Sequence, residues 1–281
     1  MVLKFGLWSL PPFLAAGLRF FIAFLILSVF TVYRKLKLPR GFKIHFFFFW
    51  FGMINFTGGY AFVYWGQQYI DSGLASVLFS VMPFYVLFLS IRMLPEDKIT
   101  WKKFWGILLG FSGVVVIFVD QLNLTKIQST TIYGMIAVLI GPFFSSLGTI
   151  LGKRRMKNMH PAVLITLPMF YTSLSFFLLS TIFEVNAHPQ FDFYAVFSIF
   201  YLAAIGTALA FFVYFWMLKN TSAVLMSTIT FVTPPLALFW GWFVLAEHVS
   251  IFIIFGMILI FLGIYFVRND KNNPFTKPKI S

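Results

Sequence analysis

The chain has 281 residues, of which 60% are hydrophobic and only 10% are charged, whereas soluble domains carry roughly one-quarter charged residues, so most of it cannot face water. A net charge of +13 would suggest nucleic-acid binding in a soluble protein, but here the Lys and Arg residues lie between apolar blocks, and no nucleic-acid partner is expected. Because the chain has no cysteine, disulfides, thiol catalysis and cysteine-ligated metals are excluded.

The apolar blocks have the length of membrane-spanning helices, which need about 20 consecutive apolar residues. The continuous runs also lack the alternation that a membrane β-barrel requires. In chain order, the predicted helices cover residues 11–33, 44–66, 73–94, 101–120, 131–152, 161–184, 192–218, 221–245 and 250–267. The predicted fold class is an all-α integral membrane protein, a helical bundle with nine spanning helices in a lipid bilayer.

The basic residues indicate how the helices are oriented, because positively charged short loops stay on the cytoplasmic side. Eighteen of the 21 Lys and Arg residues lie in alternate connections and in the tail that begins at Arg268, whereas the other connections hold only Lys4 and Lys126. The C-terminus, with residues 268–281 as a basic tail, is therefore predicted to be cytoplasmic. The expected location is the cell membrane, as a multi-pass protein, which would be the inner membrane in a bacterium.

Sliding the sequence against itself by about 150 residues brings several features into register. The matched pairs are Thr57 with Thr207, Phe62-Val63-Tyr64 with Phe212-Val213-Tyr214, Ser76 with Ser227, Pro83 with Pro234, Glu96 with Glu247, Gly106 with Gly256, and Gly113 with Gly263. Equivalent helices are five steps apart, so they cross the membrane in opposite directions. The prediction is an inverted repeat, with residues 1–130 as a first half of four helices and residues 131–267 as a second half of five.

Inverted repeats are the construction of many secondary transporters. These proteins bind their substrate at the interface of the repeats, near the bilayer midplane, and alternate access by rocking one part against the other. The repeat therefore predicts a secondary transporter or facilitator rather than an enzyme.

Several short motifs occur in a fixed order along nearly the whole chain. They are Pro11-Pro12-Phe13 before Leu18-Arg19-Phe20, Ser72-Gly73-Leu74-Ala75 before Pro83 and Glu96, and Thr221-Ser222-Ala223 before Pro234, Leu245 and Glu247. In this order the chain resembles the EamA-type transporters of the drug/metabolite transporter superfamily. The resemblance implies ten helices in two five-helix inverted repeats, and export or exchange of metabolites such as amino acids. Pro95-Glu96-Asp97 and Ala246 depart from the glycine-containing pattern that the family usually has at these two places.

The first half has no counterpart of the helix predicted over 131–152, because that counterpart would lie before Met1. We favour a misassigned start, in which case the DNA just upstream encodes about 20 largely apolar residues. The alternative is a genuine nine-helix form with an external N-terminus.

Uncharged polar residues form stripes along the predicted helices. Thr57, Tyr60 and Tyr64 recur at three and four residues, which places them on one face, and Thr207 with Tyr214 repeats part of it. The complete set of candidate substrate-binding residues is Thr57, Tyr60, Tyr64, Ser80, Ser145, Thr149, Thr207, Tyr214 and Thr230. The alternative role for each Ser or Thr is close helix packing or an interhelical hydrogen bond.

A second set of residues is interpreted as structural or hinge-forming. Pro83 and Pro234 fall within helices at equivalent positions and suggest a shared hinge, while Glu96 and Glu247 each precede a helix, where a carboxylate favours the helix dipole. Arg19 lies inside its helix, where a cation is expensive. It either snorkels or bonds helix carbonyls, or it attracts a substrate carboxylate.

The predicted activity is movement of a small organic metabolite, with export of an amino acid or a similar compound preferred. No catalytic residue, metal site or cofactor is predicted, because the sequence shows no nucleophile–base pair, phosphate loop or cluster of ligands. The competing hypothesis is a non-transporting membrane partner, or a degenerate truncated carrier. A small-molecule substrate and the bilayer are the predicted partners, and homodimer formation is left open.

Overall fold

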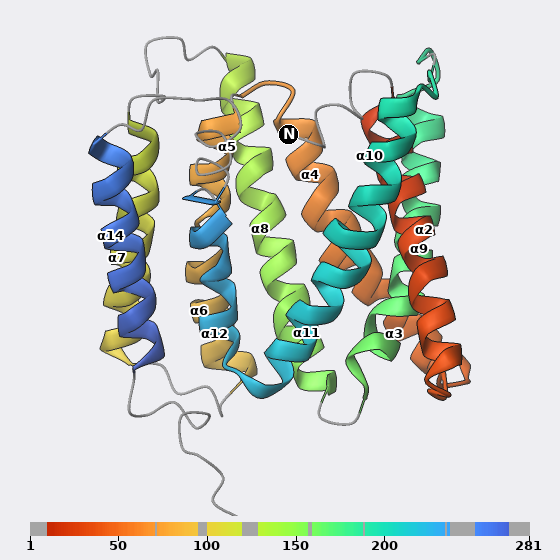
Figure 1. Ribbon diagram of the computed structural model, residues 1–281, viewed down its shortest axis with the longest axis horizontal. Coiled ribbons are helices and arrows are strands. Elements are labelled where there is room, and N and C mark those ends of the chain that lie inside the picture. The colour runs from red at the N-terminus through yellow and green to blue at the C-terminus, as the bar shows by residue number, and fades with distance from the viewer. Residues whose placement is uncertain are drawn as a thin grey trace, which may run out of the picture. The chain divides into compact units, whose positions relative to one another are not determined.

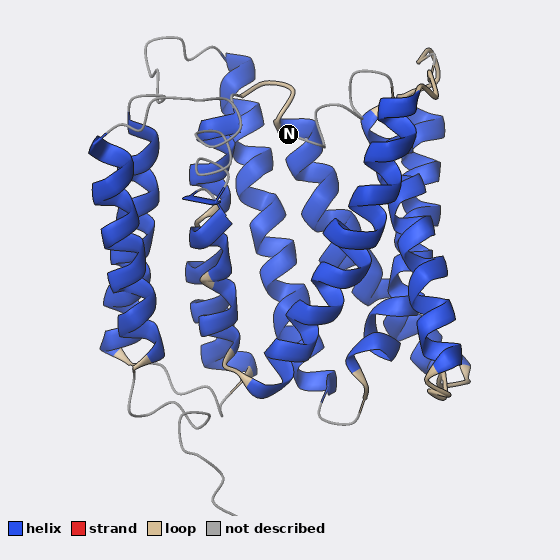
Figure 2. Cartoon of the chain, in the orientation of Figure 1, coloured by secondary structure: helices blue, strands red, loops and turns tan. Residues whose placement is uncertain are grey.

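The computed structural model describes residues 10–70, 72–94, 100–119, 129–156, 159–187, 189–233, 235–236 and 251–269. Every regular element in these ranges is a helix, as Figure 2 shows. The elements of Figure 1 are α2 (Pro12–Tyr33), α3 (Phe42–Gly52), η1 (Met53–Gly58), α4 (Gly59–Gly66), α5 (Ser72–Phe79), α6 (Met82–Met93), α7 (Trp101–Phe118), α8 (Ser129–Arg155), α9 (Pro161–Phe183), α10 (Phe193–Ala203), η5 (Ala204–Leu209), α11 (Ala210–Asn220), α12 (Ala223–Ser227) and α14 (Ile251–Arg268).

Within the described residues, eight helical stretches are long and apolar enough to cross a membrane. They are Pro12–Tyr33, Phe42–Gly66, Leu74–Met93, Trp101–Phe118, Thr130–Arg155, Pro161–Phe183, Phe193–Asn220 and Ile251–Arg268. Each coincides with one of the nine predicted segments. The ninth predicted segment, 221–245, contains a shorter apolar helix over Ala223–Thr233. Most of the second half of that segment lies outside the described residues. The predicted fold class, an all-α multi-pass membrane bundle, is confirmed.

The chain divides into two compact units. Unit 1 takes Met1–Ala61 and Leu151–Lys219, and unit 2 takes Phe62–Ile150 and Asn220–Ser281. Each unit therefore contains segments from both halves of the sequence repeat.

In unit 1, helices α2 and α9 pack along their length and run in opposite directions (Figure 1). Phe13 near the start of α2 contacts Phe183 at the end of α9, with ring centroids 6.1 Å apart, while Phe24 contacts Phe170 at 5.1 Å. Both helices begin with a proline, Pro12 and Pro161, where the missing N–H costs nothing. The fully buried large side chains of this unit are mainly aromatic and include Phe20, Phe48, Phe51, Phe56, Phe176 and Phe215.

In unit 2, helices α7 and α14 form the corresponding close pair. They meet through glycines, because an ideal Cβ on Gly113 would lie 2.5 Å from the carbonyl oxygen of Gly256, and one on Gly263 would lie 2.5 Å from that of Gly106. The contacts are reciprocal, as two-fold symmetry demands, since Gly106 and Gly113 are the repeat counterparts of Gly256 and Gly263. Small residues let helix backbones approach closely in membranes. Each unit is thus built around one antiparallel pair of repeat-equivalent helices.

Two π-helical turns interrupt equivalent spans at equivalent places. The turn η1 follows α3, and η5, beginning 151 residues later, follows α10. A π-turn inserts one residue and shifts the hydrogen-bonding pattern to i→i+5, a distortion that is frequent at functional sites. Apolar content alone does not reveal such an insertion, so the two π-turns were not predicted from the sequence.

The single helix predicted over 73–94 is interrupted in the structure between α5 and α6. The amide of Val81 bonds the carbonyl of Leu78, and that of Phe84 bonds the carbonyl of Val81, so the chain tightens to i→i+3 bonds here. Pro83, which has no N–H to donate and clashes with the preceding turn, gives the physical reason.

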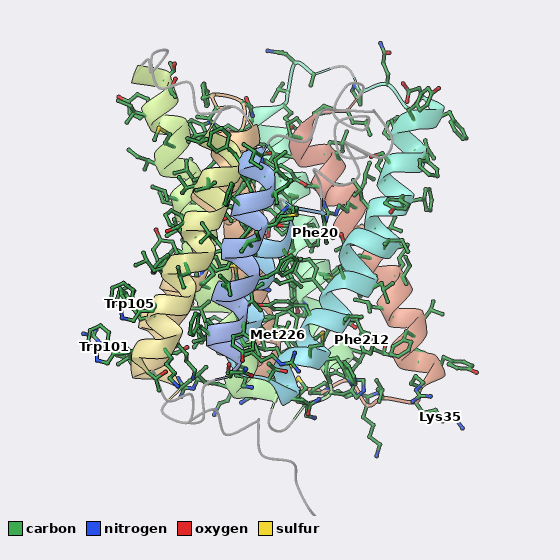
Figure 3. All side chains as sticks on the ribbon, turned by 60° about the vertical axis from the view of Figure 1, so that its left-hand side comes forward. Phe20, Lys35, Trp101, Trp105, Phe212 and Met226 are labelled. Atoms are coloured by element: carbon green, nitrogen blue, oxygen red, sulfur yellow. The ribbon has the colours of Figure 1, made fainter. Side chains whose placement is uncertain are left out.

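Large apolar side chains cover much of the outer surface. In Figure 3, Trp101 and Trp105 project outward from one end of α7, and they are 76% and 56% exposed, whereas Phe20 is fully buried. Tryptophan is enriched at the membrane–water interface, so we expect this end of α7 to lie at the membrane surface.

Candidate functional site

A buried arginine lies where elements of both repeats meet inside unit 1. Arg19, about two turns into the 22-residue helix α2, is only 8% exposed. Its Nε donates a hydrogen bond to Thr207 Oγ1 at 2.5 Å, and its Nη2 donates to the carbonyl oxygen of Gly206 at 3.1 Å. Both acceptors belong to η5. The π-turn therefore presents a hydroxyl and a backbone oxygen together to one guanidinium group.

Two aromatic rings lie beside the same guanidinium. Arg19 Cζ lies 5.4 Å from the ring centroid of Tyr60 and 5.9 Å from that of Phe20. The two rings meet edge to face at 5.5 Å, and Phe56 packs on Phe211 beside them at 4.8 Å. A cation over an aromatic face is attracted most strongly where both are desolvated.

The described carboxylates lie at helix ends and not within a span. Glu184 accepts hydrogen bonds from the amides of Phe13 at 2.7 Å and Leu14 at 3.0 Å, and so caps α2 from the end of α9. Asp192 caps α10 by accepting from the amide of Ala195 at 2.7 Å. Guanidinium groups stay protonated in proteins, so the charge of Arg19 within the span of α2 is positive and favours a negatively charged group nearby.

At one end of unit 1, His160 caps α9. Its Nδ1 accepts from the amide of Ala162 at 3.2 Å, which requires that nitrogen to be unprotonated. Burial lowers the pKa of His160 below its usual range, and the charges of Lys219 and Arg34 lower it further. Lys153 Nζ donates to the carbonyl oxygen of Leu218 at 2.7 Å and caps α11. Basic groups from several elements thus gather at this end.

The structure brings together three of the residues singled out from the sequence, namely Arg19, Tyr60 and Thr207. Thr57 lies in η1, three residues before Tyr60, and is buried. Tyr214, also in unit 1, is half-buried and packs on Phe215 with ring centroids 5.4 Å apart.

The other candidate binding residues belong to unit 2. Ser80 and Thr230 donate their hydroxyls to backbone carbonyls about one turn earlier in the chain, those of Ser76 at 2.7 Å and Ser227 at 2.9 Å. Tyr64 and Thr149 are buried and Ser145 is half-buried. That Tyr64 and Tyr214 line one site stays a prediction. Glu96, Glu247 and Pro234 lie outside the described residues.

Two further polar contacts between helices were not predicted from the sequence. Ser146 Oγ lies 3.2 Å from the carbonyl oxygen of Met82 on another helix and 2.7 Å from that of Pro142. The other is the cap that Glu184 provides for α2. A signal for it was present, because α2 begins at Pro11-Pro12 with no side chain of its own to cap the free amides, and such amides need a partner.

Comparison with known proteins shows which family the chain belongs to. The sequence profile of the EamA-like transporter family matches residues 1–119 and 132–269. The chain belongs to the EamA-like transporter family. The resemblance inferred from the short motifs is therefore confirmed, and this EamA-family chain is a multi-pass membrane transporter.

Relatives and a solved structure agree with the assignment. The uncharacterized transporter YoaV of Bacillus subtilis is 28% identical over 94% of this chain and 90% of its own length. An uncharacterized transporter in the trpA 3' region of Buchnera aphidicola is 30% identical over 94% and 89%. The probable amino-acid metabolite efflux pump of Escherichia coli is 26% identical over 94% and 88%. A solved crystal structure superimposes with a TM-score of 0.79 over 92% of this EamA-family chain and 88% of that chain at 16% identity, which shows a shared fold.

Proposed function

We propose that this transporter exports an amino acid or a similar small metabolite by alternating access, and that the core of unit 1 forms part of its substrate site. One observation carries the proposal: the buried guanidinium of Arg19 is held within the span of α2 by η5 and lies over the ring of Tyr60. A buried charge within a membrane is expensive and marks functional sites.

The place of this cluster in the repeat supports a substrate site. Helix α2 and η1 come from the first half of the sequence, and α9 and η5 from the second, and α2 packs on both α9 and η5 while α9 packs on η1. The core of unit 1 is therefore an interface between repeats, which is where transporters with inverted repeats bind their substrates.

The chemistry of the cluster supports an amphipathic metabolite with a negatively charged group. Ligand sites are mostly apolar with a few placed polar groups, and here the rings of Phe20 and Tyr60 lie beside a guanidinium, with Phe211 packed against Tyr60. Among relatives, the proteins from Escherichia coli and Salmonella typhimurium, each 26% identical, are named probable amino-acid metabolite efflux pumps. An amino acid satisfies both considerations.

The charges of unit 1 support the proposed orientation in the cell membrane. The C-terminal end of α2 carries Arg34, near His160 and Lys219, whereas the N-terminal end of α2 is capped by Glu184. Basic residues favour the cytoplasmic side, so the end with Arg34 is assigned there, together with the C-terminus of the chain.

The test is solute efflux from cells that express the transporter, followed by flux with purified protein. Cells loaded with the twenty amino acids should release one or a few of them faster when the protein is present. Liposomes with purified protein should then accumulate the same labelled amino acid by counterflow. A folded protein that moves none of them in either assay would favour the competing hypothesis of a non-transporting membrane partner.

A further inference from the structure

The two π-turns hold a threonine at equivalent positions, but the two hydroxyls differ in their bonding. Thr207 Oγ1 donates to the carbonyl oxygen of Leu202, five residues earlier, at 2.9 Å, and also accepts from Arg19. Thr57 Oγ1 is buried, in a residue only 6% exposed, and has no hydrogen-bond partner among the described residues. Buried hydroxyls without a partner are uncommon, because hydration is lost and not replaced.

The carbonyl that corresponds to the acceptor of Thr207 accepts from a different residue in the first repeat. Five residues before Thr57 lies Gly52, the counterpart of Leu202, and its carbonyl oxygen accepts from Thr172 Oγ1 of α9 at 3.2 Å. The α9 backbone lies directly on this turn, since an ideal Cβ on Gly52 would be 2.7 Å from the carbonyl oxygen of Pro168.

The asymmetry follows from the sequences of the two packing helices. Counted from the prolines that open α2 and α9, the counterpart of Arg19 is Pro168, and the counterpart of Thr172 is Ala23. At η5, in the second repeat, the facing helix is α2, and its Arg19 donates to Thr207. At η1, in the first repeat, the facing helix is α9, which has Pro168 at the corresponding position and so no side-chain donor, while its Thr172 donates to the carbonyl of Gly52.

We propose that Thr57 Oγ1 is a substrate-binding hydroxyl and that the group it binds is a carboxylate. This inference rests on the proposed function and specifies the substrate class for that site. A hydroxyl can donate one hydrogen bond to a carboxylate oxygen. Thr57 lies three residues before Tyr60, whose ring centroid is 5.4 Å from Arg19 Cζ, and the neighbouring Phe56 packs on Phe20 beside the same guanidinium at 5.6 Å. In a medium of low dielectric constant the positive charge of Arg19 favours an anionic group and opposes an ammonium group at this point.

The test uses three probes that share one aromatic ring and differ in charge. These are 3-phenylpropionate, L-phenylalanine and 2-phenylethylamine, of which only the first two carry a carboxylate. Their dissociation constants are measured by titration calorimetry on the full-length protein in detergent, for the wild type and for Thr57→Val, Thr57→Ser and Thr207→Val. The melting temperature of each unliganded protein is measured in parallel.

The wild type should bind both carboxylates more tightly than the amine. Thr57→Val should weaken carboxylate binding by about 2- to 12-fold, the range that corresponds to one hydrogen bond, with no fall in the unliganded melting temperature, because it removes only an unpaired hydroxyl. Thr57→Ser, which keeps the hydroxyl, should stay within about twofold of the wild type. Thr207→Val should instead lower the melting temperature, since it breaks the bond to Arg19.

Three outcomes would overturn the inference: equal carboxylate affinity of Thr57→Val and wild type, absence of carboxylate binding by the wild type, or a melting temperature of Thr57→Val as low as that of Thr207→Val. Failure here is distinct from failure of the proposed function. If cells expressing Thr57→Val still export an amino acid as the wild type does, the function stands and only the role of Thr57 is lost.

Discussion

At the scale of single residues, Arg19 shows how one charge can be kept within a membrane span. It donates hydrogen bonds to a hydroxyl and a carbonyl of η5, and its Cζ lies over the ring of Tyr60. Lysine could not reproduce this arrangement, because its ammonium group is a point charge without the planar fork of donors. Arg19 is therefore held by its hydrogen bonds to Thr207 and to the carbonyl of Gly206.

That pairing predicts a measurable coupling. In a double-mutant cycle of Arg19→Met and Thr207→Val, the unfolding free energies should be non-additive by about 0.5–3 kcal/mol, as for residues in direct contact. The measurement is equilibrium unfolding in mixed micelles. Thr31→Val, at the far end of α2 with its hydroxyl bonded to Ser28, is the matched control and should combine additively with Arg19→Met. Equal additivity in both cycles would contradict the contact.

His160 predicts a pH dependence of stability. Its folded-state pKa is lowered by burial and by Lys219 and Arg34, so the unfolded chain binds the proton more readily. Stability should be constant above about pH 6.5, the usual value for histidine, and should fall as the pH drops below it. His160→Asn keeps a cap for α9 and should remove that step in melting temperature between about pH 5 and 7. An unchanged step in the variant would assign the effect to another group.

At the scale of helices, the α7–α14 pair is the most closely packed element of the described structure. A methyl group at Gly113 would meet the carbonyl oxygen of Gly256 at 2.5 Å and the amide nitrogen of Ile260 at 2.9 Å. Backbone atoms cannot rotate away, so the helices must separate to admit it.

Gly113→Ala should therefore destabilise the protein by about 1–3 kcal/mol, the usual cost of overpacking. Unfolding of the purified protein by heat in detergent measures the effect. Ser112→Ala is the matched control, because Ser112 directly precedes Gly113 and its hydroxyl bonds within α7. It should cost less than about 0.5 kcal/mol. If the two variants melt alike, the glycine contact is not what holds this pair together.

At the scale of the whole molecule, the positive-inside rule predicts the topology. Single cysteines placed at Lys37 and Ala187 of this cysteine-free chain should behave oppositely toward an impermeant thiol reagent in intact cells. The cysteine at Ala187 should react and the one at Lys37 should not, because basic loops remain cytoplasmic. Reaction at Lys37 alone would invert the assignment. A variant with cysteines at both positions should be labelled completely only after the membrane is permeabilised.

Much of this molecule could be predicted from its sequence because its strongest signals are additive. Hydropathy summed over about 20 residues locates a span whatever its neighbours are, and a repeat with matched glycines and threonines can be recognised by alignment alone. The π-turns could not be predicted, because one inserted residue changes the hydrogen bonding of a helix and leaves its apolar content unchanged. The different bonding of Thr57 and Thr207 was also hidden. It depends on which residues of α2 and α9 lie opposite them, Arg19 in one case and Thr172 in the other.

The antiparallel pairs of repeat-equivalent helices also have a consequence for biosynthesis. Helix α2 gains its main neighbour, α9, only after about 150 further residues have been made, and α7 must wait equally long for α14. At roughly 5–20 residues per second, each early helix spends on the order of ten to thirty seconds in the bilayer before that neighbour leaves the ribosome. Such helices must be stable in lipid as individuals and assemble afterwards. A ribosome that stalls after the first half would leave both of them waiting, exposed to the quality-control proteases of the membrane.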